Sequence, residues 1–182
     1  MRAFILVDLG FGDAGKGLMT DTLARETQSG LVVRYNGGAQ AGHHVVTPDG
    51  RQHTFSQFGA ATFLPGVKTF LSSDVIIHPG ALLQEGKALA AKGVPDCFDR
   101  LTVSDRSLVV TPFHQAANRI HELARGAERH GSCGVGIGET YEDHLEDKTK
   151  SILSRDLGNK SSLIEKARRI REHKKILLIQ RY

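Results

Sequence analysis

The 182-residue sequence has few cysteines and no long apolar run. Its two cysteines, Cys97 and Cys133, are isolated and lack metal-ligand spacing, so a reducing compartment would keep them as free thiols. No apolar stretch approaches the length of a membrane span. The opening MRAFILVDLG lacks the charged region, long apolar core and cleavage site of a signal peptide. We therefore expect a cytoplasmic protein that does not associate with a membrane.

The sequence also has little that indicates nucleic-acid binding. The formal net charge of +4 is compatible with anionic ligands but is ordinary for a globular protein. Basic residues gather between Lys166 and Lys175, and no aromatic side chain interrupts them. Such a run is typical of the solvated face of a helix, so we expect no nucleic-acid partner.

What the chain does contain is glycine, concentrated in three loops. The first lies within AFILVDLGFGDAGKGLMTDTLA, from Ala3 to Ala24. Ala3–Leu9 has the apolar run of a strand buried on both faces, Gly10–Gly17 holds four glycines in eight residues, and helical spacing begins at Leu18. This pattern predicts a strand, a loop and a helix whose free N–H groups point at an anion.

The first loop departs informatively from the phosphate-loop pattern G-x-x-x-x-G-K-[ST]. Gly10, Gly15 and Lys16 fit, but Gly17 stands where the magnesium-binding hydroxyl belongs. Asp13 is then placed to supply an oxygen ligand for magnesium, or to act as a base on whatever lies across the phosphate. The alternative interpretation is a glycine-rich turn that serves packing alone.

A second glycine-rich loop follows the next predicted strand. Leu31–Tyr35 reads as a strand and runs into Asn36–His44, NGGAQAGHH. Two such strands joined by a helix form a βαβ unit, with both loops at the carboxyl edge of a parallel sheet, where ligands bind. A histidine here could donate to a phosphate or a developing oxyanion; the alternative is a tight turn with exposed histidines. The polar residues of this loop are Asn36, Gln40, His43 and His44.

Further elements complete an α/β pattern. We expect a mostly parallel sheet with helices on both faces, a phosphate-loop-like glycine-rich loop and a peripheral hairpin turning at Asp49-Gly50. His114 and His121 fall on or near a predicted helix and are expected to be structural or at the surface. The expected hairpin strands are Val45–Val46 and Gln52–Phe58; the other expected strands are Lys68–Ser72, Val75–Ile77, Leu101–Val103 and Leu108–Val110; the expected helices are Ala81–Lys92 and Phe113 to about Glu128.

The third loop and the region after it give weaker signals. Gly131–Gly138, GSCGVGIG, could wrap a second anionic group. Glu142–Arg155 is highly charged and is expected to be exposed or disordered. Ser161–Lys175 predicts a basic helix beginning at a serine cap, and the apolar Ile176–Ile179 follows it. A new apolar element so near the last residue suggests that residues 1–182 are an incomplete domain.

Taken together, the three loops resemble those of the adenylosuccinate synthetase family. The family reads G-x-Q-W-G-D-E-G-K-G-K, then R-[YF]-x-G-G-x-N-A-G-H-T, then G-T-T-G-R-G-I-G-P-x-Y-x-D. This sequence has LGFGDAGKGL, RYNGGAQAGHH and GSCGVGIGETYED in those places. The similarity extends through SSDVIIHPGALLQEGKALAAKGV and RLTVSDRSLVVTPFHQAANR to about Leu157.

The resemblance implies a two-step ligase reaction that consumes GTP. GTP phosphorylates the 6-oxygen of IMP, and the amino group of L-aspartate then displaces that phosphate to give adenylosuccinate. By position, Asp13 would be the general base and a Mg²⁺ ligand, and His43 the acid that stabilises the 6-oxygen. Lys16 would neutralise phosphate charge, and Gly42 would offer a carbonyl oxygen to the metal. The residues implied at the GTP and Mg²⁺ site are Gly12, Asp13, Ala14, Gly15, Lys16, Gly17, Gly42, His43 and His44; those implied at the nucleotide substrate are Asp13, Lys16, Gln40, Ala41, Gly42, His43, Ser132 and Cys133.

The departures from the family pattern fall on the side of the acceptor nucleotide. EDHLEDKTKS follows Tyr141, where the family contributes an arginine across a dimer interface, so only Lys148 or Lys150 could stand in. The individual replacements are Phe11 for tryptophan, Ala14 for glutamate, Gln40 for asparagine, Cys133 for threonine with Ser132 as its possible substitute, and Val135 for arginine.

Three functional classes therefore stay open. The first is the N-terminal part of a purine nucleotide–aspartate ligase, and the second is a relative that joins a different purine acceptor or amino acid. The third is a nucleotide-binding remnant without activity, which the intact pair Asp13 and His43 argues against. A homodimer is implied by the resemblance alone.

Overall fold

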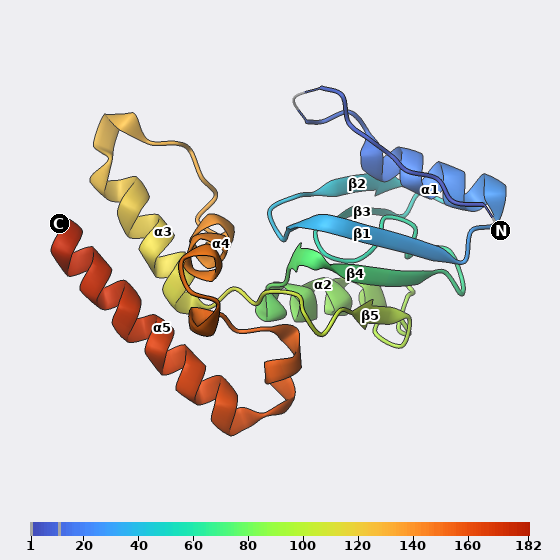
Figure 1. Cartoon of the computed structure of the whole chain (residues 1–182). Helices are drawn as coiled ribbons and strands as arrows, with labels where there is room; N and C mark the ends of the chain where they lie inside the picture. Colours follow the sequence, from blue (N-terminus) through green and yellow to red (C-terminus); the bar gives the residue numbers. More distant parts are fainter. Residues whose placement is uncertain (1, 11) are drawn as a thin grey trace.

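The computed structural model describes residues 2–10 and 12–182, and in them five α-helices accompany a three-stranded sheet and a separate hairpin (Figure 1). Phe11, one of the departures from the family pattern, lies outside the described residues. In chain order the elements are α1 (Lys16–Thr27), β1 (Leu31–Gly38), β2 (His43–Val46), β3 (Gln52–Phe55), β4 (Lys68–Ile76), α2 (Pro79–Ala91), β5 (Leu101–Val103), α3 (Pro112–Ala124), α4 (Ile137–Glu146) and α5 (Lys160–Arg181), with short 3₁₀ turns at Gly126–Glu128, Lys148–Lys150 and Ser154–Gly158.

The sheet has the strand order β1-β4-β5, and both pairs are parallel. Leu31 pairs with Lys68 and Arg34 with Leu71, and an irregularity follows between Arg34 and Asn36. The expected parallel α/β sheet is therefore confirmed. Hairpin β2–β3 lies in the connection between β1 and β4, and its strands pair antiparallel around the turn at Gly50, as expected.

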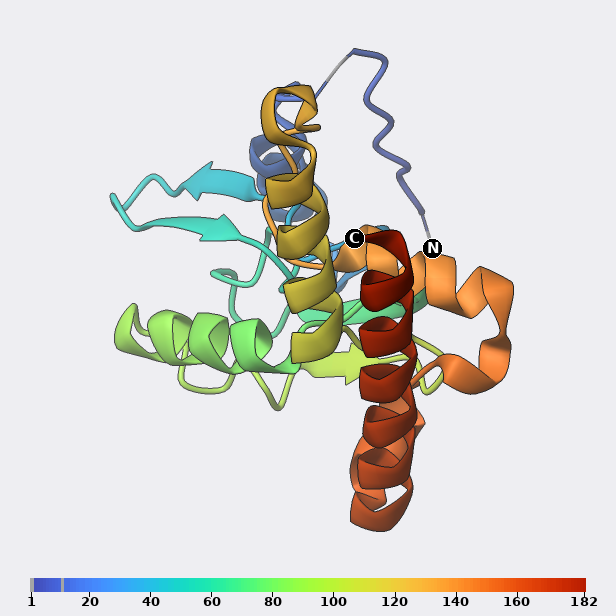
Figure 2. The ribbon, with the colours of Figure 1, turned by 90° about the vertical axis from the view of Figure 1, so that its left-hand side faces the viewer.

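One hydrophobic cluster joins the hairpin to α2. Val45 and Phe55 of the hairpin pack with Phe58 and Phe63 of the following loop and with Leu89 of α2. Figure 2 shows the hairpin and α2 extending to the same side of the sheet. This packing fixes the start of β2, where His43 lies, relative to the sheet.

A second cluster joins the sheet to α5. Leu71 and Val75 of β4 pack with Val109, Ile152 and Ile170, all almost fully buried. Ile170 belongs to α5, which is one continuous helix that begins at the cap Asn159 and includes the apolar Ile176–Ile179. The expected serine cap near Ser161 is therefore wrong by about one half turn, and the apolar segment is not a new element.

The expected strand at Ala3–Leu9 is wrong. Residues 2–9 have no regular structure, and the side chains of Ile5 and Leu9 are 81% and 95% exposed. At its end the segment closes a local turn, because Asp8 Oδ1 accepts a hydrogen bond from the Gly10 N–H at 2.8 Å. Such side-chain bonds compete with a strand ladder for the backbone. The first βαβ unit is consequently absent from the described residues.

Two expectations for the later chain also need correction. Leu108–Val110 forms isolated bridges to Ile77 and Leu153 and no strand. The charged region Glu142–Arg155 is largely helical or turn-like, with Asp143 buried in α4. Its charges are ordered because several of them find partners in α3 and α5, as described below.

Candidate functional site

The first glycine loop ends where α1 begins, at Lys16. Gly12, Asp13 and Gly15 have positive φ angles of 103°, 54° and 73°, in the left-handed region that favours glycine and that aspartate tolerates. Gly15 is the N-cap residue, and no side chain caps the helix. The free N–H groups of the first turn and their partial positive charge therefore stay available to an anionic ligand.

Lys16 makes an ion pair that the sequence did not indicate. Its Nζ donates to Asp8 Oδ2 at 2.5 Å, and its side chain is 33% exposed. The bond from Lys16 and the second bond from the Gly10 N–H lower the pKa of Asp8 below its usual value, so the carboxylate is ionised at neutral pH. The phosphate-loop lysine is thus paired with a carboxylate of its own chain.

The first two loops meet at Gly17 and His43. A Cβ added to Gly17 would lie 2.8 Å from the carbonyl carbon of His43 and 2.9 Å from its Cα, closer than real Cβ contacts come. Only glycine lets α1 approach the start of β2 this closely. The packing also explains the departure from the phosphate-loop pattern, because a serine or threonine at position 17 would collide with the His43 backbone.

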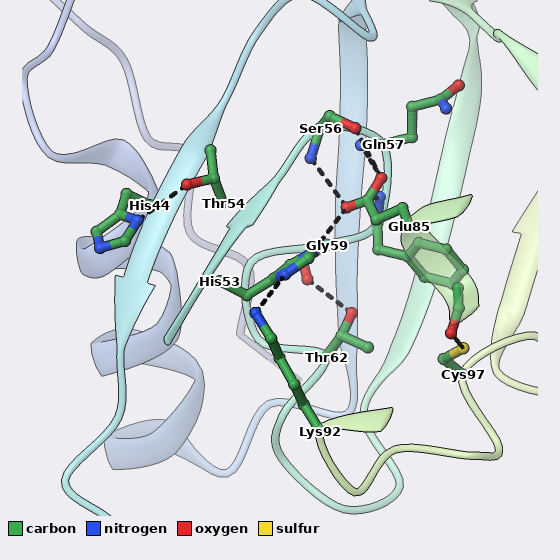
Figure 3. Close-up of polar contacts among 12 residues, drawn as sticks. His44, His53, Thr54, Ser56, Gln57, Gly59, Thr62, Glu85, Lys92 and Cys97 are labelled. Atoms are coloured by element: carbon green, nitrogen blue, oxygen red, sulfur yellow. Dashed lines mark hydrogen bonds and ion pairs between the residues drawn. The ribbon is translucent and has the colours of Figure 1, made fainter. Parts of the chain in front are cut away.

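His43 is held neutral by its surroundings. Burial, assisted by the positive charges of Arg34 and Lys16, lowers its pKa to about 4. At neutral pH the imidazole is therefore uncharged, with one N–H to donate and one nitrogen to accept a proton. Its neighbour His44 is exposed, and His44 Nδ1 lies 2.9 Å from Thr54 Oγ1 across the hairpin (Figure 3).

Arg34 contacts the backbone of the second loop and was not singled out from the sequence. It is buried in β1, and its Nη2 donates to the carbonyl oxygen of Ala41 at 3.1 Å. The signal was present as a charged residue inside the apolar run LVVRY. Gln40 is exposed, and Gly42 is packed so that an added Cβ would lie 2.8 Å from Thr54 Cγ2.

The third loop approaches the second through its last residues. A Cβ on Gly38 at the end of β1 would lie 2.7 Å from Ile137 Cδ1, where α4 begins. Earlier in the loop, Glu122 accepts hydrogen bonds from the N–H groups of Gly131 and Ser132, and Asn118 donates to Ser132 Oγ at 3.0 Å. Cys133 is exposed. The third loop is thus held by α3, and within the described residues the hydrogen bonds of Ser132 go to α3 and not to the first two loops.

Two surface hollows lie away from these residues. One of 650 Å³ is lined by Arg2, Phe4 and residues 26–30. The other, of 330 Å³, lies between α1 and the hairpin and is lined by residues that include Leu18 and Val46. The expected site residues line neither hollow.

Glu85 joins α2 to the residues that follow β3 (Figure 3). Its carboxylate accepts hydrogen bonds from the N–H groups of Ser56 and Gln57 and from the Ser56 hydroxyl, at 2.8–2.9 Å. Burial alone would raise the pKa of Glu85, but the bonds from His53, Ser56 and Gln57 outweigh it and lower that pKa. Glu85 therefore anchors the end of the hairpin to α2 and has a structural role.

Comparisons with known proteins identify the family of the chain. A family model described as adenylosuccinate synthetase matches residues 5–182. The chain belongs to the adenylosuccinate synthetase family. The three glycine loops described above all lie within the matched range.

Curated relatives in the adenylosuccinate synthetase family match the chain but extend well beyond its length. The adenylosuccinate synthetase of Saccharopolyspora erythraea is 37% identical over 145 residues, which is 80% of this chain and 33% of the relative. That of Mycolicibacterium vanbaalenii is 34% identical over 182 residues, which is 100% of this chain and 41% of the relative. The chain thus spans 33–41% of the length of these two relatives.

Two solved structures share the fold. A fully ligated adenylosuccinate synthetase from Plasmodium falciparum superimposes with a TM-score of 0.80 at 24% identity, over 92% of this chain and 38% of that one. The cyanophage S-2L succinoaminodeoxyadenylate synthetase (PurZ), bound to dGMP and to dATP as an energy donor, gives 0.64 at 23% identity, over 83% and 40%. Among the described residues, no helix is long and apolar enough to cross a membrane.

A second polar cluster in this family member lies between α3, α4 and α5, away from the loops. Lys174 is buried, and its Nζ lies 2.8 Å from Glu139 Oε2 and 2.7 Å from Asp143 Oδ1. His114 and His121 of α3 are also buried, at 3.2 Å from Asp143 and 2.7 Å from Glu139. The expectation that these histidines are structural fits this arrangement, whereas Lys174 does not belong to a solvated helix face.

The tautomer of His114 follows from its partners. The Thr111 backbone N–H donates to Nδ1 at 3.0 Å, so Nε2 carries the hydrogen that points to Asp143. Burial alone would raise the pKa of Asp143, but the hydrogen bonds from His114 and Lys174 outweigh it and lower that pKa. The cluster is therefore a set of buried ion pairs that joins α3, α4 and α5.

Proposed function

We propose that the chain forms the phosphate-binding and phosphoryl-transfer part of a GTP-dependent ligase that joins L-aspartate to a purine nucleotide. The contact between Gly17 and His43 carries this proposal, because it places the start of a helix and its phosphate-loop lysine beside a neutral histidine. Family membership supports the reaction: phosphorylation of the 6-oxygen of IMP by GTP, then displacement of that phosphate by the aspartate amino group.

Asp13 is proposed as the general base and as the oxygen ligand of Mg²⁺. It is exposed, and no hydrogen bond to another described residue engages its carboxylate. The close packing of Gly17 excludes the hydroxyl that serves the metal in the usual phosphate loop, so another oxygen must do so. Carboxylate and carbonyl oxygens suit Mg²⁺, which fits Asp13 together with the Gly42 carbonyl. Bound there, the metal would neutralise charge on the transferring phosphoryl group.

Lys16 and His43 have complementary roles in this proposal. Lys16 would bind phosphate oxygens as a positive charge, together with the free N–H groups at residues 15–17. His43, neutral at pH 7, would donate its N–H to the 6-oxygen as that oxygen is phosphorylated. The phosphoryl charge arriving beside it would raise its pKa and so increase the fraction of His43 that carries a second proton.

A different purine acceptor is a second candidate, and the third loop favours it. Ser132, the possible substitute for the family threonine, has its hydroxyl oxygen bonded by Asn118, and Lys150 is paired with Glu146 at 3.1 Å. Each lost phosphate contact would weaken binding of the acceptor by about 1–3 kcal/mol. The relative from cyanophage S-2L, whose structure contains dGMP, is an example of a similar fold with another nucleotide.

Calorimetric titration of the chain with GTP and Mg²⁺, followed by IMP or dGMP, tests these proposals. We expect wild type to bind GTP with Mg²⁺, and both Asp13→Ala and Lys16→Ala to lose most of that binding. Lys175→Ala, which removes an exposed lysine on α5, is the matched control and should bind as wild type does.

The outcomes separate the candidates. A wild-type chain that fails to bind GTP with Mg²⁺ contradicts the proposal, as does undiminished binding by Lys16→Ala. Preference for dGMP over IMP selects the second candidate. Homodimer formation, proposed from the family resemblance, is measured by sedimentation of the same samples.

A further inference from the structure

The ammonium group of Lys16 already has an anionic partner in this chain. Lys16 Nζ donates to Asp8 Oδ2 at 2.5 Å, while Asp8 Oδ1 accepts the Gly10 N–H at 2.8 Å. Both oxygens of the carboxylate are therefore engaged, one by the loop lysine and one by the loop backbone. A phosphate oxygen that approached Lys16 would meet this carboxylate first.

The pair is built so that it can open. Asp8 lies in the segment 2–10, which has no regular structure, and its neighbour Leu9 is 95% exposed. The side chains of Lys16 and Asp8 are 33% and 13% exposed, and an ion pair that solvent reaches contributes little to stability. Little packing is lost if Asp8 swings away, whereas α1, which carries Lys16, is fixed against β2 through Gly17.

The Asp8 carboxylate and a polyphosphate cannot both bind the Lys16 ammonium, because both are negatively charged. A triphosphate brings several negative oxygens to within about 3 Å of Lys16, and an ionised carboxylate sharing that ammonium would be repelled by them. The bonds from Lys16 and Gly10 keep the Asp8 carboxylate ionised at neutral pH by lowering its pKa. Protonation of Asp8 therefore does not relieve the repulsion.

We propose that Asp8 is an internal competitor of the nucleotide polyphosphate for Lys16, so that nucleotide binding displaces the Asp8 carboxylate and frees segment 2–10 from the loop. This inference rests on the proposed function, because it concerns the same phosphate site. It assigns to Asp8 the setting of nucleotide affinity, a role separate from the chemistry of Asp13 and His43.

The test compares binding of GTP with Mg²⁺, and of tripolyphosphate alone, to wild type, Asp8→Asn and Asp8→Glu by calorimetry. Asp8→Asn removes the charge and should tighten binding about two- to fivefold, the range expected for losing one exposed ion pair. Asp8→Glu keeps a carboxylate near Lys16 and should bind as wild type does. Asp49→Asn, which removes a carboxylate paired with Arg51 in the hairpin turn, is the matched control and should leave affinity unchanged.

A second measurement follows the displaced segment directly. Hydrogen exchange at the Gly10 amide, which Asp8 accepts in the free chain, should accelerate in wild type when tripolyphosphate binds. In Asp8→Ala, which has no acceptor for the Gly10 N–H, it should be fast with or without ligand.

Each other outcome overturns the inference. Unchanged or weaker binding by Asp8→Asn would mean that Asp8 does not compete; weaker binding would instead assign it to support of the ligand. If Asp49→Asn tightened polyphosphate binding equally, the effect of Asp8→Asn would come from the change in net charge and not from competition for Lys16. If wild type binds GTP with Mg²⁺ and Lys16→Ala does not, these results refute the competitor alone, whereas failure of every variant to bind refutes the proposed function as well.

Discussion

Lys16 and Lys174 are both paired with carboxylates, and they differ in what surrounds them. Lys16 meets one carboxylate at the exposed end of a glycine loop, with 33% of its side chain exposed. Lys174 meets two carboxylates between three helices, with 5% exposed. An exposed pair can exchange its partner for a ligand at little cost, while a buried pair that loses one partner leaves a charge without water. The first pair therefore suits binding, and the second suits holding the fold.

The largest expected effect comes from breaking the buried pair. Lys174→Met leaves Glu139 and Asp143 buried without their shared cation, which should lower the free energy of unfolding by about 3–5 kcal/mol. Urea denaturation followed by circular dichroism measures this. Lys175→Met, on the exposed side of the same turn, is the control, and an equal loss in both variants would contradict the assignment.

The contact between the first two loops should give the next largest effect. Gly17→Ala places a Cβ 2.8 Å from the His43 backbone, and the resulting overpacking should destabilise the chain by about 1–3 kcal/mol. Gly138→Ala, in a helix with nothing within 4 Å of its added Cβ, should be neutral or slightly stabilising. Thermal unfolding of the two variants compares them, and equal midpoints would show that α1 does not depend on this approach.

Acid should lower the stability contributed by Asp143, in the buried cluster around Lys174, by a smaller amount. Because the pKa of Asp143 is lower in the folded chain than in the unfolded chain, its contribution to stability is present above the unfolded value of about 3.9 and is lost as pH falls through the lower folded value. Unfolding free energies of wild type and Asp143→Asn, measured between pH 6 and 3, should therefore converge toward the acid end. A constant difference would argue against the ionised pair.

The smallest effect concerns the protonation of His43. Proton NMR should find its imidazole titrating near pH 4, with burial as the main cause and the charges of Arg34 and Lys16 as assistance. Lys16→Gln removes one of those charges and should raise the midpoint. A midpoint near 6.5, the value of an ordinary histidine, would mean that the second loop is more open than described.

The sequence predicted most of the fold that depends on local patterns. The hairpin followed from Asp49-Gly50 between apolar residues, and α2 ends where Gly93 adopts a φ of 87°. Ala3–Leu9 had the apolar run of a buried strand yet forms none, because periodicity cannot show whether a neighbouring strand is present to pair with it. The burial of Lys174 was missed because it lies within a run of basic residues that is typical of a solvated helix face. Leu163, Ala167 and Ile170 nevertheless form an apolar stripe that Lys174 continues at helical spacing.

The candidate site was predictable in part for the same reason. Motif positions brought Asp13, Lys16, Gly17 and His43 forward, and the contact of Gly17 with His43 supports that grouping. Asp8 and Arg34 were missed because their roles depend on contacts between separate segments, to Lys16 and to the Ala41 carbonyl. A charged residue within an apolar run was the available signal for both.

The approach of Gly17 to His43 also constrains how this loop could have evolved. A lineage that gained a hydroxyl at position 17, and with it the metal ligand of the common phosphate loop, would push β2 and its histidine away from the helix. One substitution would thus add an oxygen ligand and displace His43, the proposed acid. A hydroxyl at position 17 would therefore require β2 to shift, and glycine is the residue that fits while β2 stays where it is.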